Sequence, residues 1–142
     1  MTAYQDFHPI DCFGPPPSDR RIAIGWLERG TEYSQGEVTR DFFERLKALV
    51  ANRFEPVLSV GLHQCDLCQF DGPLGSGNLF VPDGERMFVC PELVVHYVDA
   101  HSYEPPTEFQ EAVIRCPDPA GREYRTAFLR AGGRALLDLP AN

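Results

Sequence analysis

Two cysteines separated by two residues, Cys65 and Cys68, have the spacing in this sequence that most directly indicates chemistry. We call residues 65–68 the cysteine turn, because a tight Cys-x2-Cys turn aims two sulfurs at one ion. Farther along the chain lie His96 and His101, with four residues between them. A Cys-x2-Cys pair followed by His-x4-His falls within the ligand spacings of structural zinc sites. Two thiolates and two imidazoles favour a closed tetrahedral Zn²⁺ site over Mg²⁺ or Ca²⁺.

The step between the two histidines restricts how they can meet. At about 100° per residue, a five-residue step turns the second side chain about 140° from the first on an ideal helix. The nearby Pro105 and Pro106 favour a helix that ends early, so we expect His101 at or just past the helix end. His63 and Cys90 are possible substitute ligands, one just before the cysteine turn and one at the start of the predicted helix.

Other interpretations of these residues stay open. The cysteines and histidines could each be buried independently. A thioredoxin-like redox pair is less favoured, because residues 69–73 (QFDGP) cannot open the helix whose N-terminus would lower a thiol pKa. Catalytic zinc would need an open coordination position and a general base. The nearest carboxylates for such a hydrolase-like enzyme are Glu92 and Asp99.

Composition indicates a single soluble domain spanning residues 1–142, with 43% hydrophobic residues available for a core. No apolar run approaches the roughly 20 residues that span a bilayer, and the start of the chain does not resemble a signal peptide. We therefore expect a cytoplasmic protein without membrane contact. Five cysteines are an odd number, and thiols stay reduced in that compartment, so a disulfide framework is not expected.

The charge distribution argues against nucleic acid as a partner. The net charge is -8, and residues 61–118 carry ten acidic side chains against Arg86 and Arg115. Phosphate contacts require Lys and Arg. The predicted helix at residues 91–101 also lacks the Lys, Arg, Asn and Gln side chains that read DNA. After this acidic section, residues 119–142 carry Arg122, Arg125, Arg130 and Arg134 against Glu123 and Asp138.

Hydrophobic periodicity predicts an α+β fold, with a small sheet packed by two or three helices. Within it, residues 61–104 form a zinc-binding unit made of the cysteine turn, a β-hairpin and a helix. Pro82, Asp83 and Gly84 mark the hairpin turn, Gly36 or Ser34 could cap the first helix, and Thr107 to Gln110 fit a capping box. The predicted strands are 21–27, 57–63 and the hairpin 78–90; the predicted helices are 37–51, 91–101 and 108–115. A proline-rich arm (1–20) and a weakly ordered basic tail (117–142) flank this body.

Several short motifs together resemble a family of small, uncharacterised bacterial proteins. They are IGWL (24–27), GEV (36–38), HQCDLC (63–68), VP (81–82) and HYVDAHSYEPPTEF (96–109). The likeness covers roughly residues 21–114. It implies a bacterial cytoplasmic protein with the Cys/His set at Cys65, Cys68, His96 and His101, and it implies no activity.

The function predicted from these observations is a zinc-stabilised protein-binding or adaptor module. One version is an immunity-type protein whose acidic residues at 99–111 neutralise a basic toxin. The alternative is a metal-dependent, hydrolase-like enzyme that uses the same zinc site. Cys12, Cys90 and Cys116 are expected to pack as small apolar residues, and Trp26, the single tryptophan, is expected in the core.

Overall fold

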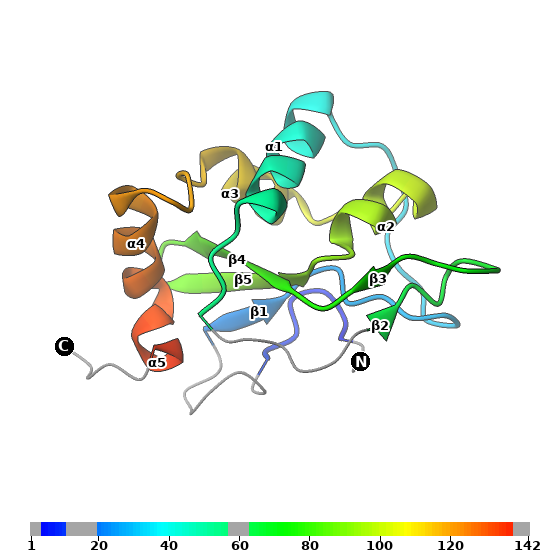
Figure 1. Ribbon diagram of the computed structural model, residues 1–142, viewed down its shortest axis with the longest axis horizontal. Coiled ribbons are helices and arrows are strands. Elements are labelled where there is room, and N and C mark those ends of the chain that lie inside the picture. The colour runs from blue at the N-terminus through cyan, green and yellow to red at the C-terminus, as the bar shows by residue number, and fades with distance from the viewer. Residues whose placement is uncertain (1–3, 11–19, 57–62, 138–142) are drawn as a thin grey trace.

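The computed structural model describes residues 4–10, 20–56 and 63–137 of the chain. These residues form an α+β fold whose elements follow the order β1, α1, β2, β3, β4, β5, α2, α3, α4, η1, α5 (Figure 1). The strands are β1 (Arg21–Ala23), β2 (His63–Gln64), β3 (Leu74–Gly75), β4 (Asn78–Asp83) and β5 (Arg86–Pro91). The helices are α1 (Arg40–Ala51), α2 (Val94–His101), α3 (Thr107–Arg115), α4 (Arg122–Phe128), the wide turn η1 (Leu129–Gly133) and α5 (Arg134–Leu136).

The main sheet has the order β1-β5-β4. β4 and β5 form the predicted antiparallel hairpin, and β1 runs parallel to β5 on its other side. The hairpin turn lies at Gly84 and Glu85 rather than at Pro82 to Gly84, because Pro82 belongs to β4 and pairs with Met87. A proline is tolerated there since β4 is an edge strand.

The predicted strand at residues 21–27 is shorter in the structure. β1 ends at Ala23, and Gly25 turns the chain with a φ of 75°, a conformation that suits glycine. Trp26 is buried, as predicted, and its indole N–H donates to the Val89 carbonyl at 2.9 Å. The predicted strand at 57–63 lies outside the described residues except for His63, which begins β2 and pairs with β3.

The predicted helices are present, but their starts differ. α1 begins after Thr39, whose hydroxyl accepts the Phe42 amide at 3.1 Å, and not at Gly36 or Ser34. α2 begins at Val94 because Pro91 is still paired with Asn78 as the last residue of β5. α3 begins at Thr107, with Pro106 in the cap position, so the predicted capping box does not form.

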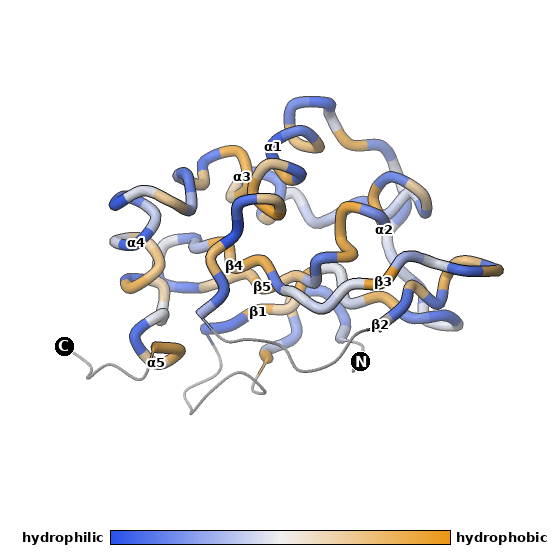
Figure 2. Tube along the Cα trace, in the orientation of Figure 1, coloured by the Kyte–Doolittle hydropathy of each residue, from blue (hydrophilic) through white to orange (hydrophobic). Residues whose placement is uncertain are grey.

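The core lies between the sheet and the helices. α1 and α3 both contact β4 and each other, and they lie along one side of the sheet (Figure 1). Phe109 of α3 meets Phe42 of α1 and Phe88 of β5 edge to face, with ring centroids 6.2 and 5.6 Å apart. These three side chains are at most 1% exposed. Figure 2 shows hydrophobic stretches along β4 and β5 and hydrophobic positions that alternate with hydrophilic ones on α1.

The prediction of a weakly ordered tail is wrong for residues 117–137. α4, η1 and α5 pack against the end of the sheet, and Tyr124 and Phe128 are buried. The Tyr124 hydroxyl donates to the Phe80 carbonyl of β4 at 2.6 Å. The arginines occupy the outer side of these helices, so the basic composition concealed an amphipathic pattern. Residues 138–142 lie outside the described part of the chain.

The predicted N-terminal arm is described only in part. Residues 4–10 run along β1: the Phe7 amide donates to Ala23, Pro9 forms an antiparallel bridge with Ile22, and Ile10 is fully buried. Residues 1–3 and 11–19, including Cys12 and the three consecutive prolines, lie outside the described residues. Within the described residues, no helix has both the length and the apolar character needed to cross a bilayer.

Candidate metal centre

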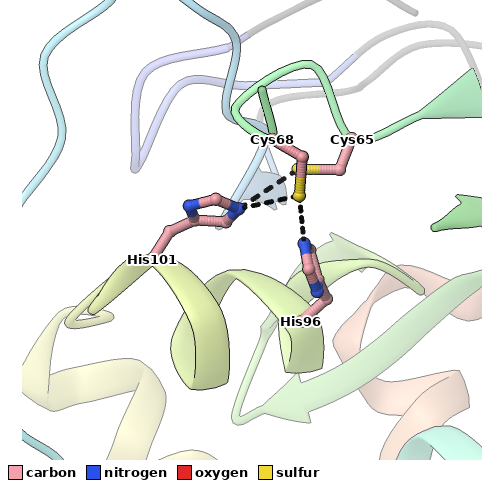
Figure 3. A group of neighbouring side chains, drawn as sticks. All are labelled: Cys65, Cys68, His96 and His101. Atoms are coloured by element: carbon pink, nitrogen blue, oxygen red, sulfur yellow. Dashed lines mark hydrogen bonds between the residues drawn. The ribbon is translucent and has the colours of Figure 1, made fainter. Parts of the chain in front are cut away.

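The structure brings Cys65, Cys68, His96 and His101 together. The cysteines lie in the loop between β2 and β3, and the histidines come from α2, as Figure 3 shows. One possible ligand atom from each residue lies within 4.8 Å of the other three. Cys65 is buried and the other three side chains are partly buried. Two segments separated by the β4–β5 hairpin therefore supply one group of four side chains able to hold a metal ion.

The separations between these atoms fit a tetrahedral metal. Cys68 Sγ lies 3.3 Å from His96 Nε2 and 3.4 Å from His101 Nε2, and Cys65 Sγ lies 3.5 Å from His101 Nε2. Zn–S bonds of about 2.3 Å and Zn–N bonds of about 2.0 Å at tetrahedral angles place sulfur and nitrogen about 3.5 Å apart. Three of the four sulfur–nitrogen separations thus match those around one tetrahedral Zn²⁺.

The cysteine turn is closed by backbone contacts from the segment that follows it. The Cys65 amide donates to the Pro73 carbonyl at 3.0 Å, and the Gln64 side-chain amide donates to the Gly72 carbonyl at 2.7 Å. A Cβ at Gly72 would lie 2.4 Å from the Cys65 carbonyl oxygen and 3.1 Å from the Cβ of Cys68. Only glycine allows this approach, so Gly72 is part of the site although it offers no ligand atom.

Arg29 also supports the cysteine turn, and the ligand spacing gave no indication of it. Its Nε donates to the Asp66 carbonyl at 2.8 Å and its Nη2 donates to the Cys68 carbonyl at 2.9 Å. Its own amide donates to the Asp66 carboxylate at 3.0 Å. The guanidinium thus binds two carbonyls of the turn and helps to fix its shape.

The position of His101 at the helix end is confirmed. α2 ends at His101, and Ser102 adopts a left-handed conformation with a φ of 54°. The Tyr103 amide closes this end by donating to the Tyr97 carbonyl at 3.1 Å. The Tyr33 hydroxyl donates to the His101 carbonyl at 3.0 Å. These contacts hold the last residue of α2 where its ring reaches the same sulfur as His96.

Burial and neighbouring charges shift the pKa values of side chains in and beside the group of four. Burial, followed by the neighbouring His101, lowers the pKa of His96, so this imidazole is neutral and able to bind a metal at pH 7. Burial, followed by Cys65, raises the pKa of the Cys68 thiol. Burial, followed by the charges of Cys65, Asp66 and Cys68, also raises the pKa of Tyr97. Within the described residues the buried Tyr97 hydroxyl has no hydrogen-bond partner.

Comparison with known families identifies the group to which the chain belongs. The sequence model of a domain of unknown function (DUF7919) matches residues 2–114. The chain belongs to the DUF7919 family. The predicted membership of an uncharacterised family is thereby confirmed, and the match extends farther toward the N-terminus than residue 21. Comparison with curated proteins and with solved structures finds no match.

The DUF7919 match contains all four residues of the metal centre and ends at the close of α3. It therefore includes the β1–β5–β4 sheet and excludes α4 to α5. The family description names no reaction, ligand or partner, so the arrangement of the side chains carries the functional argument.

The predicted substitute ligands have different outcomes in this DUF7919 protein. Cys90 lies on β5 with no exposed surface, away from the group, and burial raises its pKa. It packs as a core residue, as predicted for an apolar cysteine, and among the described residues it is not a member of the group of four. His63 pairs through its backbone with Gly75, and its side chain is not described. Its role as a ligand stays a prediction.

The carboxylates considered for catalysis are not members of the group of four, although the charge of Asp99 acts on His96. Glu92 accepts the amides of Ser76 and Gly77 at 3.1 and 3.3 Å and lies 3.7 Å from an Arg53 nitrogen. Asp99 is exposed on α2. Among the described residues, no Asp or Glu belongs to the group of four. Cys116 is buried, and its thiol donates to the Pro117 carbonyl at 3.4 Å.

Proposed function

We propose that Cys65, Cys68, His96 and His101 bind one Zn²⁺ ion whose role is structural. The observation that carries this proposal is the approach of four suitable donor atoms to within 4.8 Å of one another. Soft thiolates with imidazoles favour zinc over hard cations, which prefer oxygen ligands. Four protein ligands complete a tetrahedral shell and leave no position for a substrate or an activated water.

The ion would join two segments that lie far apart in the sequence. The β2–β3 loop projects from the body of the molecule, whereas α2 is anchored in the core through Val94 and Tyr97 (Figure 1). Binding of zinc to both would fasten the loop to the helix, and the free energy of binding would become free energy of folding. This supports a structural ion in preference to a catalytic one.

The function of the chain, in this proposal, is to bind a basic protein partner, as an adaptor or immunity-type protein does. The acidic segment, residues 99–111, carries Asp99, Glu104, Glu108 and Glu111 and no Lys or Arg. Three of these four carboxylates are exposed, and Glu104 is partly buried. A surface of one charge sign attracts a partner of the opposite sign and speeds their association.

The projecting β2–β3 loop offers a second surface for such a partner. Phe70, just after the cysteine turn, is 78% exposed, and Leu74 is 59% exposed. Figure 2 shows hydrophobic residues at the outer end of this loop. Exposed aromatic side chains are enriched where proteins bind one another, so zinc would support the loop that presents them.

Metal analysis of the purified chain tests the zinc proposal. Protein expressed without added metal should contain about one equivalent of zinc, and a chelator that removes it should lower the thermal unfolding midpoint. Metal content well below one equivalent, together with unchanged stability of Cys65→Ser, would contradict the proposal.

The partner is tested separately, through the genes adjacent to the one that encodes this chain. If a neighbour encodes a basic toxin, co-expression should protect the cell, and the pair Glu108→Lys and Glu111→Lys should abolish protection without changing zinc content. A neighbouring toxin that neither binds the chain nor is neutralised by it would contradict the immunity-type role.

A further inference from the structure

Apart from the metal centre, the described residues form a cleft beside the N-terminal segment. It is a cleft of about 420 Å³, formed by residues 4–6, 26–27 and 31–34. Its volume falls within the range of about 300–1,000 Å³ that is usual for ligand sites. Residues 4–6 are held to residues 26–27 by a backbone hydrogen bond, in which the Tyr4 amide donates to the Trp26 carbonyl at 3.3 Å. We call it the aromatic cleft, since Tyr4, Trp26 and Tyr33 all line it.

The aromatic side chains of the cleft are fixed in position. Tyr4 and Trp26 meet edge to face with ring centroids 5.6 Å apart, and Tyr33 meets Tyr103 in the same way at 6.2 Å. Trp26 is anchored by its hydrogen bond to Val89, and Tyr33 by its hydrogen bond to His101. Aromatic faces attract cations, and Tyr4 and Tyr33 are the partly exposed rings of the cleft, whereas Trp26 is only 6% exposed. A rigid cleft lined by these rings is therefore suited to a flat or compact cation.

Two carboxylates add negative charge to the same cleft. Asp6 is partly buried and accepts hydrogen bonds from the Gly25 amide at 3.0 Å and the Tyr103 hydroxyl at 2.8 and 2.9 Å. Glu32 is exposed at its rim. Burial raises the pKa of Asp6 more than these hydrogen bonds lower it, so its charged form would gain from a nearby cation.

Within the described residues, no Lys or Arg of the chain itself neutralises Asp6 or Glu32. All thirteen Lys and Arg side chains fall in the described ranges, and none of them forms an ion pair with Asp6 or Glu32 there. Arg29, which lies in the same loop as Glu32, instead binds the carbonyls of Asp66 and Cys68. Among the described residues, the cleft thus combines aromatic side chains with two carboxylates that form no ion pair with a Lys or Arg.

We propose that the aromatic cleft binds the guanidinium group of an arginine side chain presented by a partner protein. A guanidinium is planar and weakly hydrated, stacks on aromatic faces and offers a fork of N–H donors to a carboxylate. The cleft supplies both kinds of partner, since Tyr4, Trp26 and Tyr33 line it together with the carboxylates of Asp6 and Glu32. A lysine ammonium is more strongly hydrated and cannot stack, so it suits the cleft less well.

This inference rests on the proposed function, in which the partner is a basic protein, and it names the chemical group that the partner contributes. The cleft adjoins the acidic segment: the Gly36 amide donates to Ser102 and the Glu104 amide donates to Ser34, both at 2.9 Å. An arginine in the cleft would therefore lie beside further negative charge on the same surface.

Titration of the zinc-loaded protein with N-acetyl-arginine methylamide tests the proposal. Trp26 is the single tryptophan and lines the cleft, so its fluorescence reports binding there directly. We expect a saturable change with a Kd of about 1 mM, as suits a ligand of this size. The citrulline analogue, which is nearly isosteric but neutral, should bind at least about tenfold more weakly, because it lacks the charge. The lysine analogue should also bind more weakly than the arginine one.

Matched variants show whether the carboxylates are responsible. Glu32→Gln should weaken arginine binding by about tenfold, whereas Glu28→Gln, on the same exposed loop but outside the cleft, should leave it unchanged. Any one of four results would overturn the proposal. These are the absence of saturable binding, equal affinity for the arginine and citrulline ligands, equal affinity for the arginine and lysine ligands, and unchanged affinity in Glu32→Gln. Zinc content is measured on the same sample. If zinc-loaded protein does not bind the arginine ligand, the result contradicts the cleft proposal and leaves the zinc proposal unaffected.

Discussion

His96 and His101 lie five residues apart on α2, yet their Nε2 atoms approach the same sulfur, Cys68 Sγ, at 3.3 and 3.4 Å. Their ring centroids are 5.0 Å apart and the rings are nearly perpendicular. The end of α2 at His101 accompanies this arrangement, because on an ideal continuing helix a five-residue step would turn the second side chain about 140° away from the first. The convergence of both rings on Cys68 makes this residue the most informative ligand to change.

Cys68→Ser should reduce bound zinc to well below one equivalent, since a hydroxyl is a poor zinc ligand at neutral pH. At free zinc of 1,000 times Kd, the loss of metal binding removes about 4 kcal/mol from the free energy of unfolding. Denaturant unfolding and metal analysis measure both effects. Cys116→Ser is the matched control: this buried cysteine lies outside the group, and a serine can keep the bond to Pro117, so zinc should be retained. Loss of zinc from both variants, or from neither, would contradict the assignment.

Arg29→Ala should weaken zinc binding by about 10- to 100-fold, the usual effect of removing a group that orients ligands. The reason is that the guanidinium binds the carbonyls of Asp66 and Cys68 at once. Arg29→Lys should not restore binding, because an ammonium cannot span both carbonyls. Competition with a chromophoric chelator gives the affinities, and Arg40→Ala, at the exposed start of α1, serves as control. Wild-type affinity in Arg29→Ala would show that the cysteine turn keeps its shape without this side chain.

Gly72→Ala should disturb the cysteine turn, since the added Cβ would lie 2.4 Å from the Cys65 carbonyl oxygen. We expect a destabilisation of about 1–3 kcal/mol, as for other overpacked sites, and at least about tenfold weaker zinc binding. Gly121→Ala adds the same methyl group where the nearest atom is 3.4 Å away, so zinc affinity should not change. Chelator competition and thermal unfolding compare the two variants. A Gly72→Ala protein that binds zinc like the wild type would mean that the turn closes differently.

Zinc affinity should rise with pH. The raised pKa of Cys68 keeps its thiol protonated at neutral pH without metal, so binding as a thiolate must release that proton. We expect at least one proton released per ion, from Cys68, and a slope of about one or more in log affinity per pH unit near neutrality. The lowered pKa of His96 means that this imidazole opposes binding only at more acidic pH. Calorimetry in two buffers of different ionisation enthalpy counts the protons, and an affinity independent of pH would exclude thiolate ligation.

Much of the fold could be predicted from the sequence because its signals are local. The apolar positions of α1 and α3 repeat at helical spacing, and alternating apolar runs around Gly84 produce the β4–β5 hairpin. Errors arose where tertiary packing overrode a local signal. Pro91 suits a helix start, yet it completes β5 because Asn78 is available as its partner. α4 was missed because its arginines and the nearby Gly132 concealed the spacing of Tyr124 and Phe128.

The sequence by itself determined which four side chains could share a metal, because two short motifs carry thiol and imidazole groups at fixed spacing. Only the tertiary structure decided that they meet, since the approach depends on the hairpin that brings the cysteine turn over α2. It also decided the supporting contacts. Arg29 and Asp66 are 37 residues apart, and Tyr33 and His101 are 68 apart. No periodicity or spacing links residues so distant, because their contact results from how the whole chain packs.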